Sequence, residues 1–208
     1  MKPTHVAVEG PIGVGKSTLV RRLAKHYGAR EVLEDIRNPF LDDFYAGKPG
    51  AAFQCQVYFL LMRYQQQQAL VQEDLFSQAT VSDYLFLKDK IFAYLNLEQD
   101  ELNVYERLFS VLVEQVARPD LVIYLQAPDE TLVQRIKKRG RPSEQKISKE
   151  YLSELNKAYN YFFFHYEETP LLVVNTAAFD LAEGEAELAE LIRQVERIEG
   201  GTRYYVPA

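Results

Sequence analysis

The chain has 208 residues and a formal net charge of −6. Apolar residues make up 47% of it and charged residues 26%, which suits one globular domain with a sizeable core. An acidic chain argues against a nucleic-acid-binding surface, because such a surface needs a basic face. No apolar run is long enough to cross a membrane, and no charged-then-apolar leader precedes the first strand, so we expect neither membrane insertion nor a signal peptide.

The single cysteine, Cys55, has no partner for an internal disulfide and no Cys/His metal spacing around it. We therefore expect it to be a small buried side chain. This cysteine usage fits a reducing, cytoplasmic compartment.

Strands and helices are predicted to alternate along the chain. Residues 4–9 form an apolar strand that ends in a glycine-rich turn, and residues 17–27 follow with helical spacing of apolar side chains. The prolines and glycines of 38–50 predict a loop that holds one short helix. The remaining predicted elements are strands at 31–33, 79–83, 121–125 and 171–174, and helices at 51–76, 88–96, 101–117, 129–138, 149–167 and 183–198.

Strands separated by helices pair in parallel through right-handed crossovers. We therefore predict a single domain over residues 1–208, a three-layer α/β fold around a five-stranded parallel sheet. The tail at 200–208 is expected to be loose.

The turn after the first strand matches G-x-x-x-x-G-K-[ST] in full, between an apolar strand and an amphipathic helix. Backbone N–H groups of such a turn surround phosphate oxygens, and the following helix adds its N-terminal dipole. Lys16 supplies charge to the outer phosphates and the Ser17 hydroxyl a ligand to Mg²⁺. The predicted ATP site is therefore Gly10, Pro11, Ile12, Gly13, Val14, Gly15, Lys16, Ser17 and Thr18. Switches, motors and small-molecule kinases share this motif, so it does not decide the reaction.

Two acids follow predicted strands, at the sheet edge where α/β proteins bind ligands. Glu34 follows 31–33, and Asp83 ends 79–83. One carboxylate near the γ-phosphate can accept a proton from an acceptor hydroxyl, and another can hold Mg²⁺. Either acid can also be a solvated residue or a helix cap. The strand at 121–125 ends without an acid, which makes Asp83 the magnesium candidate beside Ser17.

A basic cluster runs from Arg135 to Arg141, with Arg135 and Arg139 on one helix face. Arginines neutralise the charge that develops during phosphoryl transfer, so the cluster predicts a lid over ATP at about 135–149 that includes Arg135, Arg139 and Arg141. The alternatives are a solvated helix end and an RNA-binding patch.

These motifs, in this order from Val6 to Val174, resemble the deoxynucleoside kinases, including their bacterial branch. The resemblance implies an ATP- and Mg²⁺-dependent enzyme with the P-loop kinase fold and an Arg-rich lid. Glu34 resembles the general base that activates the sugar 5′-hydroxyl. Tyr45, ahead of Lys48-Pro49, resembles the tyrosine that contacts the 3′-hydroxyl.

The same resemblance assigns residues to the base. Gln56 matches the glutamine that reads the base, and Arg63 the arginine between base and catalytic glutamate. Asp89 and Phe92 match an acid and a stacking phenylalanine. Without the family, Phe92 and Tyr45 are equally well explained as core residues. In the lid, Arg135, Arg139, Arg141 and Glu144 fit R-x-x-x-R-x-R-x-x-E, whose glutamate also meets the 3′-hydroxyl.

One position departs from the family pattern. The third strand is usually followed by Asp/Glu-Arg-Ser, whereas this chain has Asp83-Tyr84-Leu85. The acid is present, but Tyr84 removes a cation from the neighbourhood of the phosphates and the acids.

The resulting hypothesis is a deoxynucleoside kinase that phosphorylates the 5′-hydroxyl with ATP. The family favours a purine, with deoxyadenosine first, and a homodimer; the aromatic run 159–166 then forms either core or a subunit interface. A thymidylate kinase-like nucleoside monophosphate kinase is the alternative enzyme, although it needs further cations for the acceptor phosphate. A non-catalytic ATP-binding protein is the other alternative, but it has no need of Glu34, Tyr45, Gln56 and Glu144 at this spacing. Neither nucleic acid nor membrane is an expected partner.

Overall fold

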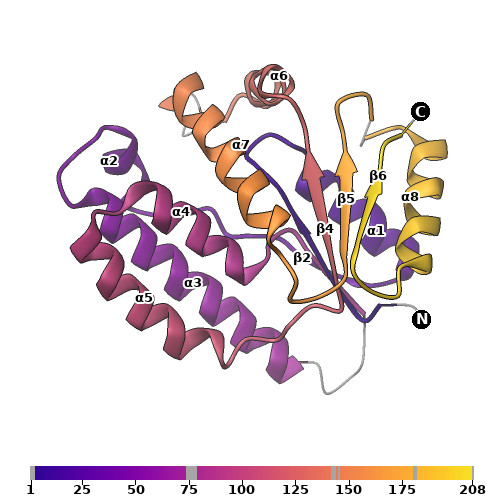
Figure 1. The fold of residues 1–208 in the computed structure, drawn as a ribbon, viewed down its shortest axis with the longest axis horizontal. Coiled ribbons are helices and arrows are strands. Elements are labelled where there is room, and N and C mark those ends of the chain that lie inside the picture. The colour runs from indigo at the N-terminus through magenta and orange to yellow at the C-terminus, as the bar shows by residue number, and fades with distance from the viewer. Residues whose placement is uncertain (1–2, 74–78, 142–143, 145, 180–181, 208) are drawn as a thin grey trace.

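The computed structural model describes residues 3–73, 79–141, 144, 146–179 and 182–207. Within these residues, six strands alternate with helices (Figure 1). The strands are β1 (His5–Glu9), β2 (Arg30–Val32), β3 (Thr80–Ser82), β4 (Leu121–Gln126), β5 (Leu171–Asn175) and β6 (Thr202–Tyr205). The helices are α1 (Lys16–Tyr27), α2 (Leu41–Tyr45), α3 (Ala51–Glu73), α4 (Asp89–Asn96), α5 (Gln99–Val113), α6 (Asp129–Arg139), α7 (Lys149–Phe164) and α8 (Glu185–Arg197), and the 3₁₀ turn η2 (Phe86–Lys88) precedes α4.

All strand pairs are parallel, in the order β2-β3-β1-β4-β5-β6. The carboxyl ends of the strands therefore share one edge of the sheet, where ligands of open α/β folds bind. The loops after β1, β2 and β3 emerge side by side at this edge. This placement brings segments that are far apart in the sequence into one site.

Alternation along the strands divides the core into two faces. Val6 and Val8 of β1, with Ile123 of β4, pack against apolar residues of α1 and α8. The intervening residues, such as Ala7 and Tyr124, pack against α4 and α7. Helices α3 and α5 form a further cluster with α4. Figure 1 shows α1 and α8 at one side of the sheet and α3, α4 and α5 at the other, so the predicted three-layer α/β fold is confirmed.

Most predicted elements lie within a few residues of their observed bounds. Helix α5 begins two residues before its predicted start because Glu98 and Glu101 form a capping box at its N-terminus. The short helix predicted in 38–50 is α2. The last residues of the predicted helix 51–76 (74–76) lie outside the described residues, as do 142, 143 and 145 of the predicted lid.

The predictions of five strands and of a loose tail were wrong. Residues 202–205 form β6, which pairs in parallel with β5 from Leu171 to Val174. The side chains of β6 from Thr202 to Tyr204 are exposed, so the strand has no buried face and no hydrophobic pattern that would predict it. Backbone pairing with the edge of β5 creates this strand, and such pairing leaves little signal in local composition.

Among the described residues, no helix combines the length and the apolar character that crossing a bilayer requires.

Candidate active site

The chain between β1 and α1 forms a tight, glycine-rich loop. Gly10, Gly13 and Gly15 all have positive φ, at 153°, 87° and 108°. A Cβ on Gly10 would lie 2.5 Å from the carbonyl oxygen of Leu125 in β4. Glycine is therefore required at this position both for its backbone conformation and for the close approach of β4.

Lys16 stands at the start of α1, and its side chain reaches back to the loop that precedes the helix. Its Nζ donates to the carbonyl oxygen of Gly10 at 2.6 Å and lies 4.0 Å from Oε1 of Glu9. Burial lowers the pKa of Lys16, and the neighbouring Glu9 carboxylate opposes that shift. The ammonium is thus held at the mouth of the loop by backbone carbonyls, which phosphate oxygens can replace.

Ser17 and Asp83 meet at the predicted magnesium position. The Ser17 hydroxyl donates to Oδ2 of Asp83 at 2.6 Å, and Oδ1 of Asp83 accepts the backbone N–H of Glu34. A hydroxyl and a carboxylate in contact beside a phosphate loop are hard oxygen donors, which fit Mg²⁺. The described residues contain no cluster of three or more His, Cys, Asp or Glu side chains that would hold a metal without the help of phosphates.

Glu34, just after β2, lies between two cations. Arg63 of α3 donates through Nε to its Oε1 at 2.7 Å, and Lys88 of η2 donates to its Oε2 at 2.7 Å. Burial raises the pKa of Glu34, but the positive charges of Lys88 and Arg63 lower it by a larger amount. The net pKa therefore lies well below its usual range. The carboxylate is therefore ionised and can accept a hydroxyl proton.

Behind Arg63 lies a buried layer centred on Asp89. The Asp89 carboxylate accepts from Nη1 of Arg63, and its Oδ2 accepts from Gln56 Nε2 at 2.8 Å and from the Tyr105 hydroxyl at 2.8 Å. Gln56 Nε2 also donates to the backbone oxygen of Asp89 at 2.9 Å. The two hydrogens of the amide are thus both used, which fixes its orientation and leaves Oε1 as an acceptor.

A cavity opens in front of these groups, between the phosphate loop, α3, α4 and α7. Its wall includes eight of the predicted residues: Ile12, Lys16, Glu34, Tyr45, Gln56, Arg63, Phe92 and Glu144. Ile12, Phe59 and Tyr151 supply much of the apolar lining. Apolar walls with a few convergent polar groups are typical of small-molecule sites. The structure thus brings together residues from six segments that the sequence analysis singled out.

Asp89 is the exception among the predicted substrate residues. It is fully buried and is not among the described residues that line the cavity. The structure places it as a support for Gln56 and Arg63. Cys55 is buried as expected and lies on the cavity wall, where burial raises the pKa of its thiol to about 12.

The lid arginines point to different partners. Arg139 makes a bidentate pair with Glu144, with its Nη2 2.7 Å from Oε1, and Arg141 lies 3.5 Å from the same oxygen. Arg135 instead donates to the carbonyl oxygens of Val14 and Thr176, at 3.0 and 2.6 Å. Arg135 therefore braces the phosphate loop, whereas Arg139 and Arg141 gather around a glutamate on the cavity wall.

Sequence reasoning missed two charged residues of the site, Lys88 and Glu9. Lys88 is 3% exposed at its side chain and Glu9 is fully buried, yet both lie next to the predicted catalytic groups. A lysine in a short turn and a glutamate before a glycine-rich loop are both ordinarily solvated residues. One feature of the sequence could have indicated such a residue. Tyr84 stands where the family has an arginine, so the neighbouring acids need a cation from another position.

Comparisons with known proteins agree with this geometry. Residues 6–198 match the model of the deoxynucleoside kinase family. The chain belongs to this family. A deoxyguanosine kinase of Bacillus subtilis is 37% identical over 84% of this chain and 86% of its own length, and a deoxyadenosine kinase of Dictyostelium discoideum is 35% identical over 93% and 79%. A solved deoxyadenosine kinase from M. mycoides, with the products dCMP and a flexible dCDP bound, has a TM-score of 0.80 at 28% identity and covers 92% of this chain and 98% of that chain.

The family decides among the functional hypotheses. The chain is a deoxynucleoside kinase, a phosphotransferase, as the resemblance implied. The nucleoside monophosphate kinase and the non-catalytic ATP-binding protein have no comparable support.

Proposed function

We propose that the enzyme transfers the γ-phosphoryl group of ATP, with Mg²⁺, to the 5′-hydroxyl of a purine deoxynucleoside, with deoxyadenosine the first candidate. The observation that carries the proposal is the position of Glu34: an ionised carboxylate on the cavity wall, with Lys16 of the phosphate loop on the same wall. A related deoxyadenosine kinase from M. mycoides has been solved with bound dATP, at 29% identity and a TM-score of 0.75.

In this scheme the phosphate loop and Lys16 hold the donor, and Arg139 and Arg141 neutralise the charge on the transferring oxygens. Glu34 takes the proton of the 5′-hydroxyl as that oxygen forms its bond to phosphorus and the bond to ADP breaks. Ser17 and Asp83 would hold Mg²⁺, which shields the phosphate charges when it is bound. Tyr45 and Glu144, both on the cavity wall, are the groups for the sugar 3′-hydroxyl.

The base is held between an aromatic ring and an amide. Phe92 lies on the cavity wall and packs edge-on against Tyr159, with ring centroids 6.1 Å apart, which fixes the ring for stacking. Gln56 offers Oε1 as an acceptor, because Asp89 occupies both hydrogens of its amide. An acceptor at this place can take an N–H of the adenine amino group, but cytosine, guanine and thymine also present N–H groups, so Gln56 alone does not separate the bases. Two of the relatives, which are named for deoxyguanosine and deoxyadenosine, add support for a purine.

The test is ATP–Mg²⁺ turnover on the four deoxynucleosides and their monophosphates, with the Glu34→Gln variant alongside. We expect turnover of deoxynucleosides with deoxyadenosine first, inert monophosphates, and a loss of about a hundredfold or more in kcat for Glu34→Gln. Preference for a pyrimidine would overturn the base assignment. Unchanged kcat in Glu34→Gln would remove Glu34 from the role of general base.

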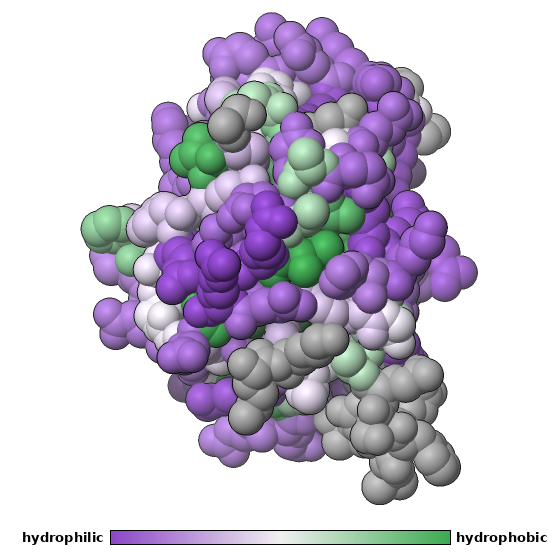
Figure 2. Space-filling model, turned by 90° about the vertical axis from the view of Figure 1, so that its right-hand side faces the viewer, coloured by the Kyte–Doolittle hydropathy of each residue, from purple (hydrophilic) through white to green (hydrophobic). Residues whose placement is uncertain are grey.

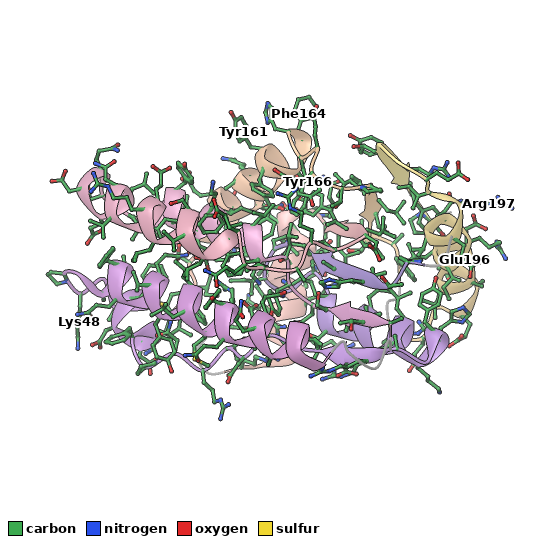
Figure 3. The ribbon with its side chains drawn as sticks, turned by 90° about the horizontal axis from the view of Figure 1, so that it is seen from below. Lys48, Tyr161, Phe164, Tyr166, Glu196 and Arg197 are labelled. Carbon is green, nitrogen blue, oxygen red and sulfur yellow. The ribbon has the colours of Figure 1, made fainter. Side chains whose placement is uncertain are left out.

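The proposal includes a homodimer formed through α7 and α4. The aromatic run in α7 is split: Tyr159 and Phe163 are buried, but Tyr161 and Phe164 are 72% and 78% exposed. Figure 3 shows Tyr161 and Phe164 projecting from α7 away from the rest of the molecule. Tyr94 of α4 is 56% exposed and, with Tyr161, lines a shallow groove between the two helices. By contrast, hydrophilic side chains cover most of the end that carries α8 (Figure 2).

A second copy of the chain would cover this aromatic face. Light scattering should give a dimer for the unmodified protein and a monomer for Phe164→Asp. Tyr204→Asp, a change at an equally exposed aromatic residue on β6, should leave the dimer intact. A Phe164→Asp dimer of unchanged stability would refute this interface. A cytoplasmic location, with the reduced Cys55, completes the proposal.

A further inference from the structure

Lys88 is buried between two carboxylates. Its Nζ lies 2.7 Å from Oε2 of Glu34 and 3.7 Å from Oε2 of Glu9, and its side chain is 3% exposed. The ammonium also stands over the ring of Tyr84, 5.9 Å from the centroid. Removing an ammonium from water costs several kcal/mol unless charged partners compensate it. The position of Lys88 is therefore set by its two carboxylates.

Glu9 is the fixed member of this group. Its Oε1 accepts the backbone N–H of Gly10 at 2.8 Å and the Tyr159 hydroxyl at 3.3 Å, and its Oε2 accepts the backbone N–H of Leu85 at 2.9 Å. These donors come from the end of β1, from α7 and from the segment after β3. Such a carboxylate cannot turn without losing several hydrogen bonds, so it holds Lys88 in one place.

Glu34 is in turn held from two sides. Arg63, itself fixed by Asp89, occupies Oε1, and Lys88 occupies Oε2. The charges alternate in the order Glu9, Lys88, Glu34, Arg63, Asp89. Arg63 reaches Oε1 through both Nε and Nη2, at 2.7 and 2.6 Å, so Lys88 is the cation that fixes the other oxygen of the carboxylate.

We propose that Lys88, anchored by Glu9, is a positioning residue that orients the carboxylate of the general base Glu34, and that it supplies the cation lost where Tyr84 replaces the family arginine. This inference rests on the proposed role of Glu34. Lys88 is itself among the residues that line the cavity, but its ammonium is held by Glu34 and Glu9, so in this scheme it acts through the Glu34 carboxylate.

The electrostatics around Glu34 support the proposal. The charged groups that face it are Lys88 from η2, Arg63 from α3, Lys16 from α1 and Asp83 after β3, whose carboxylate accepts the backbone N–H of Glu34. Without the ammonium, Oε2 of Glu34 would lose the cation that lies 2.7 Å from it, and Arg63 would remain on Oε1 alone.

The test is kcat and KM at pH 7 for Lys88→Met, Lys88→Arg and the control Lys90→Met, two residues further along and partly exposed. In Lys88→Met we expect kcat to fall about tenfold or more, because the general base loses its orientation. The KM for ATP should change little. Lys88→Arg should restore most of kcat, and Lys90→Met should behave as the unmodified enzyme.

A Lys88→Met enzyme with normal kcat would overturn the proposal. If Lys88→Met does not fold, Lys88→Gln gives the same test, because it keeps a hydrogen-bond donor but no charge. Glu34→Gln distinguishes a failure of the Lys88 role from a failure of the Glu34 role. If Glu34→Gln loses turnover while Lys88→Met keeps its kcat, only the role of Lys88 fails; if Glu34→Gln keeps turnover, the general base itself has been misassigned.

Discussion

Gly10→Ala is the most informative single change in the phosphate loop, because the loss of unfolding free energy can be worked out from the structure. Gly10 has a φ of 153°, a conformation that L-residues rarely adopt, and the added Cβ would lie 2.5 Å from the Leu125 oxygen and 2.9 Å from Cγ1 of Val14. The backbone conformation costs about 1–3 kcal/mol. The contact with β4 involves backbone, which has little freedom to move, and overpacking of this kind adds about 1–3 kcal/mol.

The matched control is Gly28→Ala at the end of α1. Gly28 also has a positive φ of 60°, but no atom lies within 4 Å of its added Cβ. This change should cost only about 1–2 kcal/mol, from backbone conformation alone. Urea denaturation followed by circular dichroism measures both variants.

We expect Gly10→Ala to lose at least twice as much unfolding free energy as Gly28→Ala and also to raise the KM for ATP, while Gly28→Ala leaves that KM unchanged. Equal losses for the two variants, with normal ATP kinetics for both, would refute the steric account of the loop.

Three further changes test other parts of the site. Lys16→Ala should lower kcat/KM for ATP about a hundredfold or more, whereas Lys25→Ala on the exposed side of the same helix should not; wild-type kinetics for Lys16→Ala would exclude the loop as the donor site. Gln56→Leu should raise the KM for the deoxynucleoside about tenfold at an unchanged KM for ATP, and equal rises in both would contradict base recognition. Because the folded pKa of Glu34 lies below the unfolded value of about 4.3, its stabilising contribution is present above that pH and is lost as the pH falls. The difference in unfolding free energy between the unmodified enzyme and Glu34→Gln should therefore fall by up to about 1.4 kcal/mol per pH unit below about pH 4.3. A difference that stays constant down to pH 3 would contradict the depressed pKa of Glu34.

The fold could be predicted from the sequence where the hydrophobic pattern and the turn residues were distinctive. The apolar strand before Gly10, the helix that ends at Gly28 and the β-branched strand at β4 all lie where their patterns predict. β6 has no such pattern, because backbone pairing with β5 specifies it rather than burial.

Most of the polar cavity wall was predicted through motifs, whereas Lys88 on the wall and Glu9 behind it were not. Glu34, Gln56 and Phe92 reach the cavity as the family pattern implied. Glu9 and Lys88 were missed because each looks like a surface residue in its local sequence, and only tertiary contacts bury the pair. Asp89 was assigned to the substrate, but its burial places it behind Gln56 and Arg63.

The late position of β6 in the chain has a consequence for biosynthesis. Until the ribosome has passed residue 205, the outer edge of β5 between Leu171 and Val174 lacks its partner. An unpaired edge of four apolar residues invites pairing with other chains. A nascent or truncated chain that stops before residue 202 would carry the whole catalytic cavity and still be prone to aggregate. The residues that complete the sheet would then serve to cover this edge, since none of residues 202–205 lines the cavity.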